Sequence, residues 1–180
     1  MLPFDLADRI RAAAVRQGKF TLRNGDTLDE YFDEYRLAAD PVLLRDVAQA
    51  LACMLPRQAE GVVAMALGGV PFAVTISAIS GVHTSFFRPA PKPYGTRKQI
   101  EGHSVDGARV VVVDDVVRSG TQVLRAIDRL HDAGATVVAA LCVLDRDLGG
   151  RERLAQYGID LHALLTPTTL NSLDSERTAS

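Results

Sequence analysis

The hydrophobic positions of this chain alternate between short unbroken runs and longer stretches with a helical period. The unbroken runs are typical of strands buried on both faces, and they cover residues 61–67, 82–87, 109–113 and 136–144. The stretches with a helical period lie at 40–55, at 72–80 and after residue 120. Strand, helix and strand in this order form parallel crossover units. The pattern therefore predicts an α/β fold with a central, mostly parallel sheet flanked by helices.

The predicted helix over 40–55 has a clear start and a clear apolar face. It opens with Asp40 and Pro41, a capping side chain followed by a proline in the first turn. One face then carries apolar side chains at helical spacing: Leu43, Leu44, Val47, Leu51 and Leu55. Such a stripe is buried against other elements, so we expect this helix to cover the sheet.

Residues 88–102 interrupt the pattern. The segment "RPAPKPYGTRKQIEG" contains three prolines, two glycines and four basic residues, a composition that a helix or a central strand does not tolerate. We therefore predict a long loop here. Loops of this length are typical of lids, and the cations favour an anionic ligand, although a solvated insertion without function would have the same composition.

Composition narrows the range of protein classes. A length of 180 residues, with 47% hydrophobic and 23% charged residues, predicts one domain over 1–180 whose polar tail at 170–180 frays. The net charge of −2 and the lack of a basic block argue against a nucleic-acid partner. No signal-peptide pattern and no apolar run of membrane-spanning length occur, so we expect a cytoplasmic protein without membrane contact.

The cysteines and histidines do not have the spacing of metal ligands. Cys53 and Cys142 are isolated within apolar segments, so we expect two buried free thiols, which suits a reducing cytoplasm. The four histidines are interpreted as structural residues that occur singly: His83, His103, His131 and His162.

Candidate chemistry is concentrated in the segment "VVVVDDVVRSGTQVL", residues 110–124. Asp114 and Asp115 follow an apolar strand, and ligands of open α/β sheets bind beyond the carboxyl ends of strands. The turn at 118–121 leads into a helix, whose first backbone N–H groups are unpaired and attract phosphate. Carboxylates accept hydrogen bonds from sugar hydroxyls. Together these features indicate a ligand that is a sugar with a terminal phosphate.

Other interpretations of the acidic pair are open. The pair can cap the following turn, or it can belong to a magnesium and phosphotransfer site of the response-regulator type. The second interpretation requires further acids at the first strand and a lysine late in the chain, and neither arrangement is present. Neither G-x-x-x-x-G-K-[ST] nor a helix-opening G-x-G-x-x-G occurs, which argues against a P-loop and against a dinucleotide site.

The segment "VVVVDDVVRSGTQ" resembles the signature of the type I phosphoribosyltransferases, which bind 5-phosphoribosyl-1-pyrophosphate (PRPP). Nearly the whole chain resembles the orotate phosphoribosyltransferases. "FTLRNGDTLDEYFDEY" is similar to their base-binding hood (here 1–39), "ALGGVP" to their pyrophosphate loop, and "RPAPKPYGT" to their lid (here 88–102); "LDRDLGGRERL" and "LHALLT" are similar to their closing strands. The resemblance implies a type I phosphoribosyltransferase fold and transfer of phosphoribosyl from PRPP to orotate, a step in UMP biosynthesis.

The resemblance also implies roles for individual residues. Catalytic roles fall to Lys92, Asp114 and Asp115, the two acids holding the ribose diol. PRPP would contact Arg23, Ala66, Leu67, Gly68, Arg88, Lys92, Tyr94, Asp114, Asp115, Val116, Val117, Arg118, Ser119, Gly120, Thr121 and Gln122. Orotate would contact Tyr31, Phe32, Arg118 and Arg146. Without the resemblance, the two aromatic residues of this last set would be interpreted as core residues.

Three further features follow from the resemblance alone. A cis peptide bond that does not involve proline is expected between Ala66 and Leu67. Mg²⁺ is the implied cofactor, held mainly by PRPP and not by a set of protein ligands. The implied assembly is a homodimer in which lid residues reach the active site across the interface.

Three positions depart from the family pattern. Pro89 replaces a second lysine of the lid, Arg118 replaces a threonine of the sugar-phosphate loop, and Gly68 stands where a lysine is often found. These departures leave two alternatives open. One is a divergent phosphoribosyltransferase that acts on another base, and the other is a non-catalytic regulator that binds PRPP.

Overall fold

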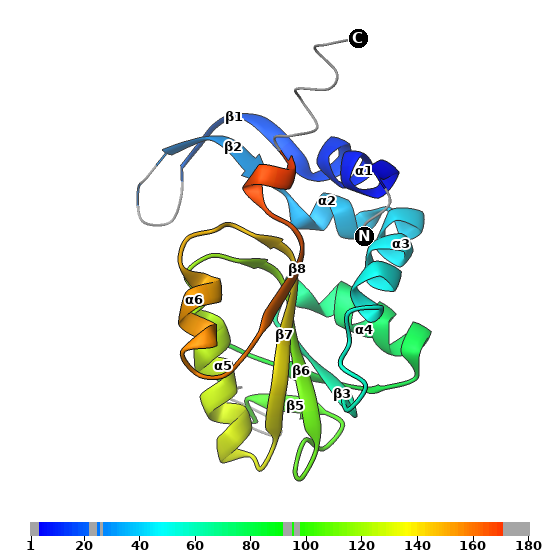
Figure 1. The fold of residues 1–180 in the computed structure, drawn as a ribbon, viewed down its shortest axis with the longest axis vertical. Helices are drawn as coiled ribbons and strands as arrows, with labels where there is room; N and C mark the ends of the chain where they lie inside the picture. Colours follow the sequence, from blue (N-terminus) through cyan, green and yellow to red (C-terminus); the bar gives the residue numbers. More distant parts are fainter. Residues whose placement is uncertain (1–3, 22–24, 26, 92–94, 96–97, 171–180) are drawn as a thin grey trace.

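A six-stranded sheet forms the centre of the computed structural model, which describes residues 4–21, 25, 27–91, 95 and 98–170. The strands lie in the order β5 (Ile100–Gly102), β4 (His83–Phe87), β3 (Gly61–Met65), β6 (Arg109–Val117), β7 (Thr136–Asp145) and β8 (Leu161–Leu165) (Figure 1). All neighbours are parallel except β4 and β5. The carboxyl ends of five strands therefore meet at one edge, where the acidic pair lies.

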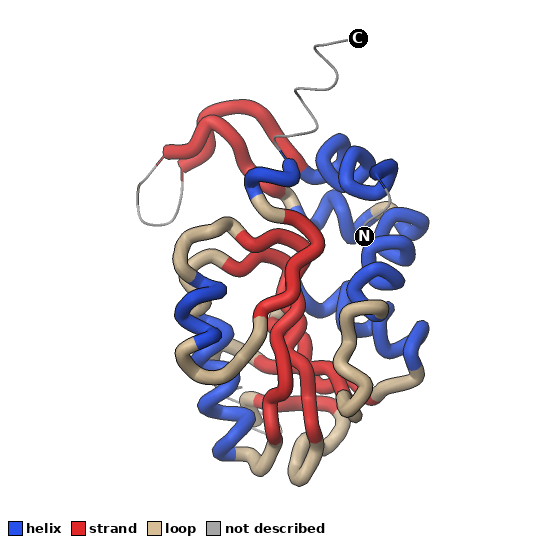
Figure 2. The backbone as a smooth tube through the Cα atoms, in the orientation of Figure 1, coloured by secondary structure: helices blue, strands red, loops and turns tan. Residues whose placement is uncertain are grey.

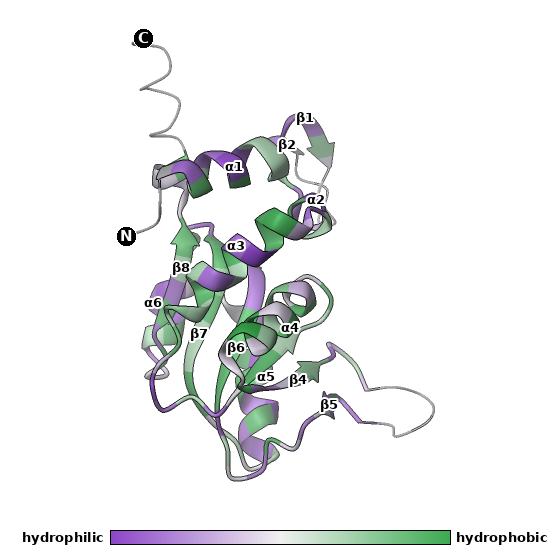
Figure 3. Ribbon diagram, turned by 90° about the vertical axis from the view of Figure 1, so that its right-hand side faces the viewer, coloured by the Kyte–Doolittle hydropathy of each residue, from purple (hydrophilic) through white to green (hydrophobic). Residues whose placement is uncertain are grey.

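Helices cover both faces of this sheet (Figures 1 and 2). On one face, α3 (Pro41–Ala52) and α4 (Gly69–Ser80) pack with Val62 and Ala64 of β3; on the other, α5 (Thr121–Asp132) and α6 (Gly150–Ala155) pack with Val63 and Met65. Successive residues of a strand point to opposite faces, so a strand covered on both sides is apolar at every position. Figure 3 shows this concentration of hydrophobic residues on the central strands.

The N-terminal part forms a separate layer above the carboxyl end of β8. Helix α1 (Phe4–Ala14) leads into an antiparallel pair, β1 (Val15–Thr21) and β2 (Thr27–Phe32), and then into α2 (Glu34–Ala39). We call these four elements the hood. Ile10 of α1 is fully buried in the same cluster as Leu164 and Leu165 of β8, which attaches the hood to the sheet.

The strands and helices predicted at 40–55, 61–67, 72–80, 82–87 and 136–144 are confirmed to within a few residues. Asp40 caps α3 as predicted, because its carboxylate accepts from the backbone N–H groups of Val42 at 2.9 Å and Leu43 at 3.0 Å. The strand predicted to end at residue 113 continues to Val117 through both acids. It can do so because β7 pairs with it along that whole length.

Three expectations need correction. The loop predicted over 88–102 ends in a short strand, β5, which forms because the chain returning from the loop pairs with the open edge of β4. Cys53 is exposed, since α3 ends just before it, whereas Cys142 is buried. Leu170, placed in the fraying tail, is buried, and its carbonyl accepts from Arg11 at 2.9 Å. Residues 171–180 lie outside the described residues.

None of the helices in the described part of the chain is both long enough and apolar enough to span a membrane.

Candidate active site

Two neighbouring carboxylates lie at the carboxyl end of β6. Asp114 is still in register with Cys142 of β7, and the backbone N–H of Asp115 donates to Asp114 Oδ1 at 3.0 Å. Both side chains are half-buried. The strand therefore holds the two acidic residues in a fixed position at the sheet edge.

A third carboxylate reaches the pair from the hood. Burial, and then the charge of Asp115, raise the pKa of Asp114 well above its ordinary value. Burial also raises the pKa of Glu34, at the start of α2, and Asp115 adds to this effect by its charge and by a side-chain hydrogen bond. Like charges this close do not ionise together easily. The cluster is therefore suited to a ligand that donates hydrogen bonds or brings positive charge.

The turn after β6 forms a small pocket. Gly120 has a left-handed backbone with φ of +70°, and this conformation lets the chain turn directly into the 12-residue helix α5. The pocket has a volume of about 220 Å³ and is lined by Asp114, Val116, Val117, Arg118, Ser119, Gly120, Thr121, Gln122 and Val123. Backbone N–H groups at the start of a helix attract anions. We call residues 118–122 the phosphate loop.

The loop after β3 lies directly beside the acidic pair. The peptide bond between Ala66 and Leu67 is cis, as predicted. A Cβ atom at Gly68 would collide with the Asp115 carboxylate, and one at Gly69 would collide with the carbonyl oxygen of Val113. The two glycines thus let this loop approach β6 more closely than any other residue type could.

The loop after β7 packs against the phosphate loop. A Cβ atom at Gly150 would collide with the carbonyl oxygen of Arg118. The backbone N–H of Arg146 donates to the carbonyl of Val117 at 2.8 Å. The backbone of Arg146 therefore lies at the same edge of the sheet as the acidic pair.

An ion pair between a buried carboxylate and a half-exposed arginine supports this last loop. Asp145 is fully buried, its Oδ1 accepts from the backbone N–H of Asp147 at 3.0 Å, and its Oδ2 lies 3.0 Å from Arg151 Nη2. Arg151 also donates to the carbonyl of Leu161 in β8. Asp147 itself has φ of +51°, a conformation uncommon for a residue with a side chain. The ion pair therefore holds the turn that carries Arg146.

Comparison with known proteins decides which family has this arrangement. Residues 46–158 match the phosphoribosyl transferase domain. The chain is 43% identical over 173 residues to the orotate phosphoribosyltransferase of Halobacterium salinarum, covering 96% of this chain and 97% of that protein. It is 38% identical to the enzyme of the same name from a Nocardioides species, with 93% of each chain covered. The chain belongs to the orotate phosphoribosyltransferase family.

Solved structures agree with this assignment. The orotate phosphoribosyltransferase of Mycobacterium tuberculosis, in complex with Fe(III) dicitrate, matches with a TM-score of 0.83 and 28% identity over 93% of this chain and 97% of that one. The orotate phosphoribosyltransferase of Aeropyrum pernix matches with a TM-score of 0.79 and 34% identity, covering 94% and 98%. The predicted type I phosphoribosyltransferase fold is confirmed.

In the hood, the neighbouring aromatic residues Tyr31 and Phe32 lie in different environments. Phe32 is only 5% exposed and belongs to the hydrophobic core, so its position does not support the predicted stacking on a base. Tyr31 is half-buried and packs against Phe20 with ring centroids 5.4 Å apart. Burial raises the pKa of Tyr31, Glu34 adds to the shift and Arg118 opposes it. Tyr31 thus lies within electrostatic reach of the phosphate loop, although the two are far apart in sequence.

The hood also contains a pocket that the sequence did not indicate. Its volume is about 460 Å³, and it is lined by Arg16, Phe20, Thr21, Tyr31, Asp33 and Arg36. The pairing of β1 with β2 brings Arg16 opposite Tyr31, and Asp33 caps α2 by accepting from the backbone N–H of Arg36 at 3.3 Å. No periodic signal in the sequence could have found this pocket, because strand pairing assembles it.

The base of the lid is closed by hydrogen bonds between its two ends. The backbone N–H of Arg88 donates to the carbonyl of Gln99 at 2.9 Å, and the Gln99 side chain donates to the carbonyls of Arg88 at 2.9 Å and Pro89 at 3.3 Å. Arg88 therefore extends directly from the end of β4. Lys92 and Tyr94 of the lid, and Arg23 of the hood, lie outside the described residues.

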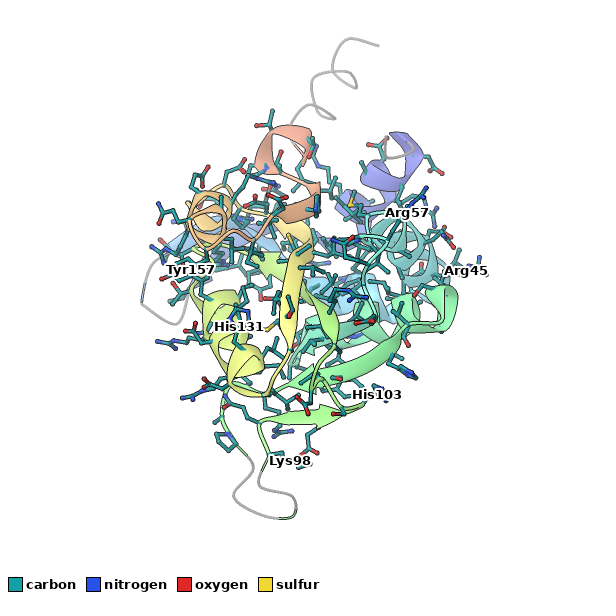
Figure 4. The ribbon with its side chains drawn as sticks, turned by 60° about the horizontal axis from the view of Figure 1, so that its bottom comes forward. Arg45, Arg57, Lys98, His103, His131 and Tyr157 are labelled. Atoms are coloured by element: carbon teal, nitrogen blue, oxygen red, sulfur yellow. The ribbon has the colours of Figure 1, made fainter. Side chains whose placement is uncertain are left out.

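Two histidines expected to occur singly are in contact. The rings of His83 and His103 stack with centroids 3.7 Å apart, at the end of the sheet opposite the acidic pair. Figure 4 labels His103, just after β5, and Lys98, just before it, so the two lie at opposite ends of this short strand, which is antiparallel to β4. Within the described residues, no group of three or more His, Cys, Asp or Glu side chains is arranged to hold a metal.

Proposed function

We propose that the protein transfers the 5-phosphoribosyl group from PRPP to orotate and releases orotidine 5′-monophosphate and pyrophosphate, a step in UMP biosynthesis. The main support is one arrangement: an acidic pair, a phosphate-sized pocket and a glycine-containing loop packed closely against the pair, all at the same edge of the sheet. The family's relatives match almost the full length of the chain, which supports the same activity.

In this proposal the end of β6 binds the sugar. Asp114 and Asp115 accept from the ribose hydroxyls, and the backbone of residues 116–122 surrounds the 5-phosphate. When pyrophosphate leaves, positive charge develops on the ribose. Carboxylates fixed beside it stabilise that charge without having to reorganise. The crowding of Glu34, Asp114 and Asp115 makes a positively charged partner still more favourable.

Pyrophosphate is assigned to the loop of Ala66, Leu67 and Gly68 and to the lid. Gly68 brings this loop against Asp115, so the leaving group lies next to the ribose. Arg88, Lys92 and Tyr94 are proposed to contact the pyrophosphate when the lid closes, and Arg23 is proposed to add a further cation. Lid closure also excludes water, which would otherwise compete for the ribose.

Phosphoribosyltransferases generally use Mg²⁺ with PRPP, and the site fits this ion. The polar groups at the end of β6 are oxygen donors, which Mg²⁺ prefers, and the phosphates of PRPP supply further oxygens. We propose that PRPP holds the ion in the main, and we assign no residue as a direct ligand. When bound, Mg²⁺ neutralises negative charge on the pyrophosphate.

Orotate is proposed to bind between the hood and the phosphate loop. Tyr31 supplies an aromatic surface, Arg146 pairs with the polar edge of the base, and Arg118 lies between them. Orotate is an anion, so these arginines match its charge. Phe32 is left out of the proposal because its side chain is part of the core.

A homodimer is the proposed assembly, with lid residues acting across the interface. Val42, Val74 and Ile79 are exposed apolar side chains of α3 and α4, two helices that pack together. Figure 3 shows the hydrophobic character of α4. An exposed apolar surface of this kind favours contact with another chain. A cytoplasmic location is also proposed, because an exposed free thiol at Cys53 suits a reducing compartment.

The departures from the family pattern keep two other functions testable. Gly68 fits its surroundings, since a lysine there would displace Asp115. Arg118 is exposed beside the proposed base site and favours an anionic base. Pro89 removes a cation from the lid, which is the one observation in favour of a regulator that binds PRPP without turnover.

A substrate panel distinguishes these functions. Purified protein would be incubated with PRPP, Mg²⁺ and, in turn, orotate, uracil, adenine and hypoxanthine, and pyrophosphate release would be measured. The proposal expects turnover with orotate at a kcat/KM far above that of any other base. Turnover with another base alone would select the divergent enzyme, and PRPP binding without any turnover would select the regulator.

A further inference from the structure

Arg153 of α6 reaches the phosphate loop from outside. Its Nη1 donates to Thr121 Oγ1 at 2.7 Å, and Thr121 Oγ1 lies 3.1 Å from Ser119 Oγ. Thr121 and Ser119 both line the 220 Å³ pocket assigned to the 5-phosphate. An arginine side chain is thus attached to the hydroxyl groups of the pocket by a short hydrogen bond.

The backbone around Arg153 is held firmly against the same loop. Gly150, at the start of α6, touches the carbonyl of Arg118, and Gly120 packs against Gly150 and the buried Leu154. The backbone N–H of Arg153 donates to the carbonyl of Gly149 at 3.1 Å. These contacts fix α6 relative to the phosphate loop. The packing of α6 against this loop therefore places the Arg153 side chain within hydrogen-bond distance of Thr121.

The hydrogen bond from Arg153 decides what Thr121 can offer a ligand. A hydroxyl group has one hydrogen to donate and accepts through its lone pairs. A phosphate dianion only accepts, so it needs hydroxyls that donate. When Arg153 donates to Thr121 Oγ1, Thr121 keeps its own hydrogen to donate, either into the pocket or to Ser119 Oγ, and in both cases one hydroxyl hydrogen of the pair is left for a ligand. The guanidinium adds positive charge that a dianion favours.

We propose that Arg153 is a positioning residue for the 5-phosphate of PRPP, orienting the Thr121 hydroxyl as a donor and adding a cation beside the phosphate loop. This inference rests on the proposed function. Residues 118–122 contain one basic residue, Arg118, which is exposed and is expected to contact orotate as well as PRPP, so Arg153 supplies a second cation from α6.

Binding of ribose 5-phosphate, followed by isothermal titration calorimetry, tests the inference on the intact protein. Arg153→Ala is expected to weaken this binding about tenfold, the loss of one hydrogen bond to a charged group. Arg153→Lys keeps the charge and is expected to recover part of the affinity. Pyrophosphate binding should be unchanged in both variants, since that ligand is assigned to the loop of Ala66 and Leu67.

Two controls separate positioning from a general effect on charge or folding. Arg129→Ala removes an exposed arginine of α5 that pairs with Asp132 at 3.1 Å, and it should leave ribose 5-phosphate binding unchanged. In a cycle of Thr121→Val, Arg153→Ala and the double variant, the effects on affinity should not add, because both changes disable the same donor. In steady-state turnover, Arg153→Ala should raise KM for PRPP and leave kcat nearly unchanged.

The outcomes also distinguish this inference from the proposed function. If the unaltered protein binds ribose 5-phosphate and Arg153→Ala binds it equally well, the role of Arg153 is wrong and the proposed function stands. Fully additive effects in the cycle, or an equal loss in Arg129→Ala, would likewise overturn it. If the unaltered protein binds no ribose 5-phosphate, the proposed function fails and this inference falls with it.

Discussion

The phosphate loop and the hood both face the carboxyl edge of the central sheet, but they are built in different ways. The phosphate loop continues directly from β6 into α5, and glycines at 120 and 150 bring backbone against backbone around it. The hood presents side chains from β1, β2 and α2. These elements are distant in sequence from β6 and α5, and they come near the site only through tertiary packing. One region offers mainly backbone groups to a ligand, the other mainly side chains.

This difference predicts how each region responds to change. A side chain added at Gly150, against the phosphate loop, would collide with the carbonyl oxygen of Arg118, so it must shift backbone and disturb the neighbouring groups of the site. A side chain changed in the hood alters one contact, unless the residue belongs to the core. Arg118 lies where the two regions meet, since it belongs to the loop and acts electrostatically on Tyr31.

The largest effect on stability is expected in the hood, where Phe32 belongs to the core and its neighbour Tyr31 does not. Phe32→Ala should lower the free energy of unfolding by about 3–5 kcal/mol, because it removes a buried aromatic side chain. Tyr31→Ala should change stability much less and raise KM for orotate. Urea unfolding and steady-state kinetics of both variants measure this contrast. A Phe32→Ala protein of unchanged stability with a raised KM for orotate would indicate that Phe32 contacts orotate and is not needed in the core.

A smaller effect is expected where two loops touch. In Gly150→Ala the new methyl group meets the carbonyl of Arg118, so the phosphate loop and the Arg146 loop must move apart. We expect kcat/KM to fall about 100-fold, as reacting groups shift by roughly an ångström. Gly158→Ala is the control: its φ of +73° makes the substitution strained, unlike that at Gly150, but an added Cβ meets no atom within 4 Å, so its kcat/KM should be retained. Equal activity of both variants would refute the close-contact account.

The ion pair of Asp145 with Arg151 should contribute less. Asp145→Asn weakens the contact with the half-exposed Arg151 and should lower the free energy of unfolding by about 2 kcal/mol. KM for orotate should rise as well, because Asp145 holds the turn of Arg146. Arg129→Ala breaks an exposed pair and should change neither quantity. If Asp145→Asn unfolds at the same urea concentration as the unaltered protein, the turn is held by other contacts.

The smallest effect on stability concerns pH. Burial and Asp115 raise the pKa of Asp114 above its ordinary value of 3.8, so over the range between the two values the folded state holds a proton that the unfolded state has lost. Stability must therefore fall as pH rises through that range. Asp114→Asn removes this penalty and should raise Tm at neutral pH by a few degrees at most, while abolishing transfer. A lower Tm of the variant at neutral pH would contradict the sign.

The comparison also explains what the sequence could predict. The strand, the acidic pair and the helix start are contiguous in "VVVVDDVVRSGTQ", so the local pattern predicted the strand, the turn and the helix that follows, and the cap at Asp40 is equally local. Glu34 beside Asp115, Arg153 on Thr121 and the stack of His83 on His103 come from tertiary packing. No periodicity or spacing could indicate them.

Single expectations failed for the same reason. Phe32 looked like a partner of Tyr31, but neighbouring residues of a strand face opposite ways, and only one of the two can point out of the core. Strand β5 is three residues long and has no pattern of its own; it exists because β4 has an open edge. Cys53 falls just past the end of α3, where one residue decides between core and solvent.

A crystal structure with PRPP and Mg²⁺ would show where the sugar phosphate binds. The account predicts the 5-phosphate within residues 118–122 and in contact with the Thr121 hydroxyl, the ribose diol against Asp114 and Asp115, and the pyrophosphate at Ala66 to Gly68. PRPP bound elsewhere, with the turn after β6 empty, would contradict it.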